Sequence, residues 1–140
     1  MTASKLTPGD PFKVVMLLYP GVTQLDLTGP AEVLGRVRGA SVELAWKNTF
    51  PVTAAAMTPP GIQLVPSVAF AAVEHADLLC VPGGPGHIEL LADEEVLAFV
   101  RRIATDSRFV TSVCTGALLL DAAGLLAGYR ATTHWNSLQF

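Results

Sequence analysis

The chain has 140 residues, of which 51% are hydrophobic and only 15% charged, and its formal net charge is −3 at pH 7. This length fits one domain with a sizeable core, and so few charged residues favour a sheet covered on both faces or a partner that covers apolar surface. The acidic balance and the lack of a basic run argue against nucleic acid or an anionic membrane as a partner.

The first half of the chain predicts two buried strands, a helical segment and a third, short strand. Residues 13–18 form a continuous apolar run, which is typical of a buried parallel strand, and Tyr19-Pro20-Gly21 ends it. A helical segment is expected over residues 31–35, with Pro30 as an early helical residue. Residues 42–46 are expected to form the second strand, and residues 62–65 a short strand among turn signals.

The second half repeats the order of strand, turn and helix. Residues 76–81 form an apolar strand that runs into the glycine-rich loop 82–86, and Asp93 is placed to cap a helix over residues 94–104. A strand over residues 109–113, a helix that stops near Gly124 and a strand candidate at 130–134 follow. Strands that alternate with helices predict an α/β fold, with a mostly parallel sheet and helices on both faces.

The N-terminal residues, the charge-free segment 48–73 and the two cysteines bear on the cellular compartment of the protein. Residues 1–11 lack the basic and then apolar order of a signal peptide, and prolines interrupt the charge-free segment 48–73, which therefore does not predict a membrane span. Cys80 and Cys114 form no disulfide framework, and neither the cysteines nor the histidines have metal-ligand spacing. We expect a cytoplasmic protein without a metal site.

The stretch from Ser112 to Gly116 has the pattern of a nucleophile elbow, a tight strand-to-helix turn that presents one reactive side chain. Cys114 occupies the place of the nucleophile, and Ser112 and Gly116 are the small neighbours that such a turn favours. The positive end of a helix dipole and first-turn N–H groups are expected to favour the thiolate. The alternative is a buried core cysteine.

Ligands of parallel sheets bind beyond the carboxyl ends of the strands, which brings two further loops toward Cys114. Asp26 stands between two leucines, in an apolar setting that favours an uncharged carboxyl group and suits it to proton transfer, although a turn or cap aspartate fits the same pattern. If Asp26 faces Cys114, the two groups share a proton, and one workable arrangement is a thiolate beside a neutral acid. Gly83 and Gly84 offer N–H groups to a developing negative charge, or else form a plain tight turn.

Two more polar residues belong to the candidate site. Thr115 supplies a hydroxyl and an N–H directly after the nucleophile, and otherwise is an ordinary first-turn threonine. His134 is a candidate base for Cys114, and otherwise a structural histidine at a strand end. Cys80 lies inside an apolar strand and is expected in the core.

Four stretches of the chain carry a resemblance to a known family. They are Tyr19-Pro-Gly-Val-Thr-Gln-Leu-Asp-Leu-Thr-Gly-Pro30, Leu79-Cys-Val-Pro-Gly-Gly-Pro-Gly86, Thr111-Ser-Val-Cys-Thr-Gly-Ala117 and residues 122–135. Together they span almost the whole chain after Lys13. They resemble the PfpI-like branch of the class I glutamine amidotransferase-like superfamily, and within it the members that hydrate isocyanides (isonitriles).

The resemblance implies a flavodoxin-like three-layer sandwich, a homodimer, no metal or organic cofactor, and hydration of an isocyanide to an N-substituted formamide. By position, Cys114 would attack the isocyanide carbon and form a thioimidate, Asp26 would manage the protons, and Thr115 would complete the site. The glycine pair at 83 and 84 and His134 would contact the substrate. Many relatives have His where this chain has Thr115, so protease-like Cys-His chemistry is not expected.

Two other functions stay open at this point. One is a glyoxalase- or deglycase-like enzyme that acts on α-oxoaldehydes, and the other is a ligand-sensing domain of a transcription regulator, since such domains share Cys-Thr-Gly and Thr-Thr-His-Trp. Asp26 in place of Glu and the stretch 22–30 favour the hydratase. Family members run longer than residues 1–140, so we expect a single domain truncated at its C-terminus, with Asn136 capping the first turn of a helix.

Overall fold

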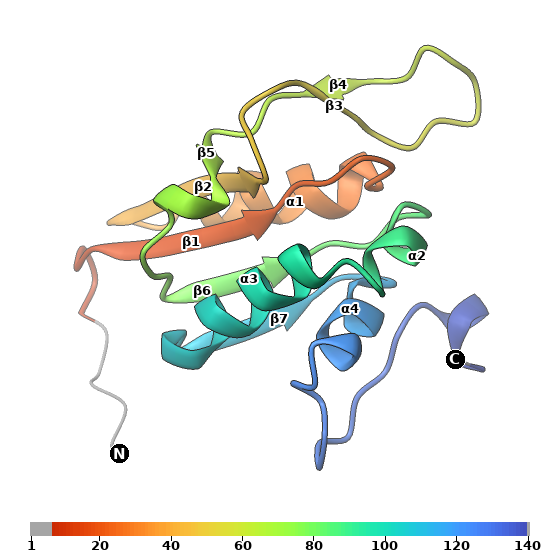
Figure 1. The fold of residues 1–140 in the computed structure, drawn as a ribbon. Helices are drawn as coiled ribbons and strands as arrows, with labels where there is room; N and C mark the ends of the chain where they lie inside the picture. Colours follow the sequence, from red (N-terminus) through yellow and green to blue (C-terminus); the bar gives the residue numbers. More distant parts are fainter. Residues whose placement is uncertain (1–6, 140) are drawn as a thin grey trace.

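A computed structural model describes residues 7–139, and its main sheet has the strand order β5-β2-β1-β6-β7 with every neighbouring pair parallel (Figure 1). These strands are β1 (Phe12–Leu17), β2 (Ala40–Trp46), β5 (Val68–Ala69), β6 (Leu78–Val81) and β7 (Phe109–Ser112). Apart from this sheet, β3 (Val52–Thr53) pairs antiparallel with β4 (Gln63–Leu64). The expected short strand at 62–65 therefore exists, but outside the main sheet.

Helices cover both faces of the main sheet. The helix α1 (Gln24–Leu34) joins β1 to β2, and α3 (Glu94–Asp106) joins β6 to β7 in the opposite direction along the sheet. Right-handed crossovers in opposite directions place their helices on opposite faces, as Figure 1 shows for α1 and α3. The elements α2 (His87–Leu90) and α4 (Gly116–Ala122) follow β6 and β7, and η1 (Phe70–Ala72) and η2 (Trp135–Ser137) are 3-10 turns. No helix in the described part of the chain is both long and apolar enough to cross a bilayer.

The core is centred on β1, whose apolar run is covered from both sides. Val14 and each following residue through Tyr19 are 0% exposed, which explains why this strand is continuously apolar rather than alternating. On the α3 side, the Phe70 ring stacks on Phe99 with a centroid distance of 3.9 Å and meets Trp46 edge-on at 5.7 Å. The predicted flavodoxin-like α/β sandwich is confirmed.

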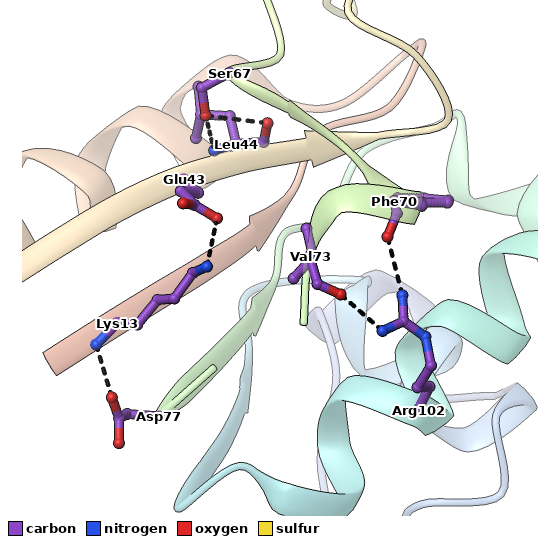
Figure 2. A network of polar contacts seen from close by, with 8 residues as sticks. All are labelled: Lys13, Glu43, Leu44, Ser67, Phe70, Val73, Asp77 and Arg102. Carbon is purple, nitrogen blue, oxygen red and sulfur yellow. Dashed lines mark hydrogen bonds and ion pairs between the residues drawn. The ribbon is translucent and has the colours of Figure 1, made fainter. Parts of the chain in front are cut away.

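Polar contacts fix the beginnings of the strands and the η1 turn (Figure 2). The Lys13 N–H donates to Asp77 Oδ2 at 2.8 Å, and its ammonium group lies 3.1 Å from Glu43, so one residue ties β1 to both neighbouring strands. Arg102 of α3 donates to two carbonyl groups in and after η1, at 2.7 and 2.9 Å. These bonds hold the connection between β5 and β6 against α3.

The start of one helix was predicted correctly and the start of another was not. Asp93 Oδ1 accepts the Val96 N–H at 3.3 Å and caps α3 as expected. By contrast, α1 begins at Gln24 rather than near Pro30, which lies inside the helix. A proline there removes one backbone hydrogen bond, and burial of Leu27 against the sheet holds the preceding turn in place. Asp26 consequently lies in the first helical turn.

The strand expected at 130–134 is absent from the structure. Its threonines favour a strand locally, but a strand also needs a ladder partner, and these residues instead run beside α4. The Thr133 hydroxyl donates to the Cys114 carbonyl at 3.2 Å and attaches this segment to the elbow. The short turn η2 that follows is capped by His134 rather than by Asn136.

Candidate active site

The turn at Cys114 has the geometry of a nucleophile elbow. Cys114 has a φ of 54°, a left-handed conformation that a non-glycine residue rarely adopts. Gly116 packs directly on β6, because a Cβ atom there would lie 2.0 Å from the Val81 carbonyl oxygen. Ser112 is exposed, so a small residue is required on only one side of the turn. The elbow predicted from sequence is present.

Replacing Gly116 with alanine is expected to destabilise the protein by about 2–3 kcal/mol, because α4 must move away from β6 to admit the methyl group. Gly29 provides the matched control, since a Cβ atom there lies 3.8 Å from the nearest side-chain atom, within helix α1. Pro30 follows directly and its ring crowds a Cβ at position 29, which offsets the gain in helix propensity, so Gly29→Ala should change the stability by less than about 1 kcal/mol. Urea unfolding of both variants measures the difference, and equal midpoints would show that the elbow tolerates a side chain at 116.

Two loops meet beside the elbow and are joined by backbone hydrogen bonds. The Thr23 N–H, at the start of α1, donates to the Gly83 carbonyl at 2.9 Å. The Gly86 N–H donates to the Gly21 carbonyl at 3.1 Å, and a Cβ atom on Gly21 would lie only 2.9 Å from Gly86 Cα. This close backbone approach fixes the helix turn that carries Asp26 relative to the glycine-rich loop.

The glycine-rich loop also touches Cys114, the candidate nucleophile. A Cβ atom on Gly83 would lie 2.8 Å from the Cβ of Cys114 and 2.7 Å from the Thr115 nitrogen. The Gly84 N–H donates to Thr115 Oγ1 at 3.0 Å in the interior. This amide is therefore engaged within the protein, which corrects the expectation that it faces a substrate. Gly83 remains the candidate donor of the pair.

Asp26 acts directly on the Cys114 thiol. Burial raises the pKa of Cys114, and so do the negative charge and the hydrogen bond of Asp26, whereas hydrogen bonds from Thr115 lower it. The net shift is upward, so the thiol retains its proton near neutral pH. The hydrogen bonds from Thr115, at the start of α4, act in the expected direction, but burial and the Asp26 charge outweigh them.

One carboxyl oxygen of Asp26 is buried without a protein partner. Asp26 Oδ2 has no hydrogen bond within the described residues, although it is shielded from solvent. Leaving such an oxygen unpaired costs about 1–3 kcal/mol, a penalty that folding seldom tolerates without a functional reason. The oxygen is available to hold a proton or to contact a bound molecule beside the thiol.

His134, a predicted site residue, and Cys80, a predicted core residue, do not contact the Cys114 thiol as Asp26 does. His134 is not among the groups that shift the Cys114 pKa. Its Nδ1 accepts the Asn136 N–H at 3.3 Å, and its ring packs on Trp135 with a centroid distance of 5.4 Å. These contacts favour the structural interpretation of His134. Cys80 is buried in β6, as expected.

Tyr19 is a residue of the site that the sequence interpretation missed. It is 0% exposed, and its hydroxyl donates to the Pro82 carbonyl at 2.9 Å. Burial first, and then the charges of Asp26 and Cys114, raise the pKa of the phenol, so its ring lies near both groups. The available signal was an aromatic residue with a polar tip directly after a fully apolar strand.

Comparison with known proteins decides the family. The DJ-1/PfpI family model matches residues 12–139. This chain belongs to the DJ-1/PfpI family. Over 123 residues it is 50% identical to the isonitrile hydratase of Pseudomonas putida. The matched residues make up 88% of this chain and 52% of that protein.

Two further comparisons show the range of DJ-1/PfpI relatives. The crystal structure of a THiJ/PfpI family protein from Pseudomonas syringae superposes with a TM-score of 0.84 at 38% identity, over 91% of this chain and 52% of that one. The HTH-type transcriptional regulator GbdR of Pseudomonas aeruginosa is 35% identical over 78 residues, which are 56% of this chain and 21% of the regulator. The chain thus spans about half the length of the isonitrile hydratase and of the THiJ/PfpI protein.

A cavity lies between α2 and α4 of this DJ-1/PfpI chain, and its lining includes neither Cys114 nor Asp26. The buried His87 links this cavity to the glycine-rich loop. Its Nδ1 lies 2.8 Å from the Gly84 carbonyl oxygen, and His87 also lines the cavity. The volume is about 480 Å³, and the lining residues are His87, Ile88, Leu91, Leu118, Asp121, Ala122 and Ser137. A mostly apolar space of this size accommodates an organic substituent rather than a charged one.

Proposed function

We propose that this protein hydrates an isocyanide to an N-substituted formamide, with Cys114 as the nucleophile and Asp26 as the proton-transfer group. The observation that carries the proposal is the pairing of an elbow thiol that retains its proton with a buried, unpartnered carboxyl oxygen. The 50% identity to an isonitrile hydratase supports this class of substrate.

The first step forms a covalent adduct. Asp26 accepts the Cys114 proton as sulfur attacks the terminal carbon of the isocyanide, and it then delivers that proton to the same carbon. A sulfur–carbon bond forms, the carbon–nitrogen triple bond becomes a double bond, and the product is a thioimidate. A carboxyl group in contact with the thiol is suited to both transfers, since its unpartnered oxygen can hold the proton between them.

The second step releases the formamide. Water adds to the thioimidate carbon as Asp26 accepts a proton from it, and Asp26 then passes that proton to the nitrogen. The tetrahedral adduct then breaks its carbon–sulfur bond as oxygen gives up its proton, which returns through Asp26 to the departing sulfur. One isocyanide and one water give one formamide, and the enzyme regains its starting protonation state.

The remaining groups have supporting roles in the proposal. Thr115 hydrogen-bonds the sulfur and lowers the pKa of Cys114, which favours the thiolate as the leaving group. The cavity beside His87 receives the substituent on the isocyanide nitrogen. We also propose a reducing, cytoplasmic compartment, because both cysteines are free thiols. A homodimer is proposed because Leu25 and Val33 leave apolar surface exposed on α1.

Incubation of the protein with a simple alkyl isocyanide in oxygen-18 water tests the proposal. We expect the N-substituted formamide to form with one labelled oxygen, as measured by mass spectrometry. A parallel incubation with methylglyoxal tests the alternative activity on α-oxoaldehydes. Conversion of methylglyoxal without any consumption of the isocyanide would overturn the hydratase proposal.

Ligand sensing is a second candidate, because the chain is 35% identical over 78 residues to a transcriptional regulator. In that case the thiol site would bind a small molecule without converting it. Equilibrium binding of the isocyanide that protects Cys114 from alkylation, with no formamide after prolonged incubation, would favour sensing over hydration.

A further inference from the structure

Tyr19 bonds the peptide unit that carries a backbone N–H beside Cys114. Its buried hydroxyl donates to the Pro82 carbonyl at 2.9 Å. The Pro82 carbonyl and the Gly83 N–H belong to one planar trans peptide unit, in which the two groups point in opposite directions. The bond from Tyr19 therefore fixes the direction of the Gly83 N–H as well.

The next peptide unit of the loop is held at both ends. The Gly83 carbonyl accepts the Thr23 N–H at 2.9 Å, and the Gly84 N–H donates to Thr115 Oγ1 at 3.0 Å. Within residues 7–139 the Gly83 N–H has no acceptor, although Gly83 lies against the nucleophile, where an added Cβ would be 2.8 Å from the Cys114 Cβ. One N–H in an otherwise locked loop, on a residue that packs against Cys114, is therefore left without a partner in this part of the chain.

We propose that Tyr19 is a positioning residue that aims the Gly83 N–H at the oxygen on which negative charge develops in the covalent adduct of Cys114. This inference rests on the proposed function for the adduct itself. A preorganised N–H donor stabilises charge on oxygen at no cost of reorganisation during the reaction. The phenol remains a donor throughout the working range, since its surroundings disfavour ionisation.

Tyr19→Phe removes the hydroxyl and keeps the ring, and Tyr129→Phe is the matched control at a tyrosine that is 77% exposed. Four quantities are compared: the iodoacetamide alkylation rate of Cys114, protection of Cys114 by propionaldehyde, and kcat and KM for formamide formation. The aldehyde adds the thiol to its carbonyl, so that a sulfur–carbon bond forms and the thiol proton moves to oxygen. This adduct carries the oxygen that the Gly83 N–H should contact, whereas alkylation produces none.

For Tyr19→Phe we expect about tenfold weaker protection by the aldehyde and about tenfold lower kcat, with KM and the alkylation rate within about twofold of wild type. Tyr129→Phe should match wild type in every measurement. An unchanged aldehyde affinity and kcat in Tyr19→Phe would overturn the inference, as would an equal fall in alkylation, which indicates a structural role. If wild type forms no formamide but aldehyde protection weakens as expected, the proposed substrate fails and the positioning role stands.

Discussion

Replacing Asp26 with asparagine is expected to speed alkylation of Cys114 while formamide formation falls by about 10²–10⁴-fold. The negative charge and hydrogen bond of Asp26 raise the pKa of the thiol, so their removal lowers that pKa and increases the thiolate fraction at a given pH. Turnover falls because the variant has no carboxyl group to carry the proton from sulfur to carbon. The two rates should therefore change in opposite directions.

The measurement is the iodoacetamide rate as a function of pH, alongside the initial rate of formamide formation. The alkylation midpoint should lie lower for Asp26→Asn than for wild type. Asp106→Asn is the matched control, because Asp106 is exposed at the end of α3. An alkylation profile that does not move on Asp26→Asn would contradict a charge-coupled pair.

Replacing Cys114 with alanine is expected to abolish formamide formation, with a loss of at least about 10³-fold, and to leave the fold intact. Without the sulfur no thioimidate forms, and uncatalysed addition of water to the isocyanide is the only remaining route. Cys80→Ala is the matched control, since Cys80 is buried in β6 and takes no part in the mechanism. That variant should keep its turnover number and lose only stability, from the cavity that it creates.

A second substitution at position 114 separates the effect of backbone strain from the loss of the thiol. Cys114 has a φ of 54°, which costs an L-residue about 1–2 kcal/mol and costs glycine little. Cys114→Gly should therefore be inactive and yet unfold at a higher temperature than Cys114→Ala. Turnover by either variant would show that another group attacks the isocyanide.

Much of the fold and part of the site could be predicted from local sequence. The apolar run before Tyr19 predicts the central strand, because a strand covered on both faces has no polar side. Asp93 and the helical spacing after it predict α3. The small residue at 116 predicts the elbow. The sequence also predicts that Asp26 lies near Cys114, because both follow strands of one parallel sheet.

Other features depend on contacts between residues far apart in the chain. The threonines at 130–134 favour a strand, yet a strand requires a partner, and Thr133 bonds the Cys114 carbonyl instead. Burial and Asp26 raise the pKa of Cys114, and Thr115 lowers it. The net direction cannot be predicted from the local sequence around Cys114. Gly84 shares a motif with Gly83, but only the approach of Thr115 occupies its N–H.

The sequence by itself indicated the family, most of the order of strands and helices, and Cys114 and Asp26 as the candidate nucleophile and its carboxyl partner. Periodicity, caps and turn residues act over a few neighbours, so they can be recognised without the fold. Only the tertiary structure shows that burial and Asp26 raise the pKa of the thiol and that the Tyr19 hydroxyl bonds the Pro82 carbonyl. Those properties are sums of burial, charge and hydrogen bonds from several loops, and folding alone brings those loops together.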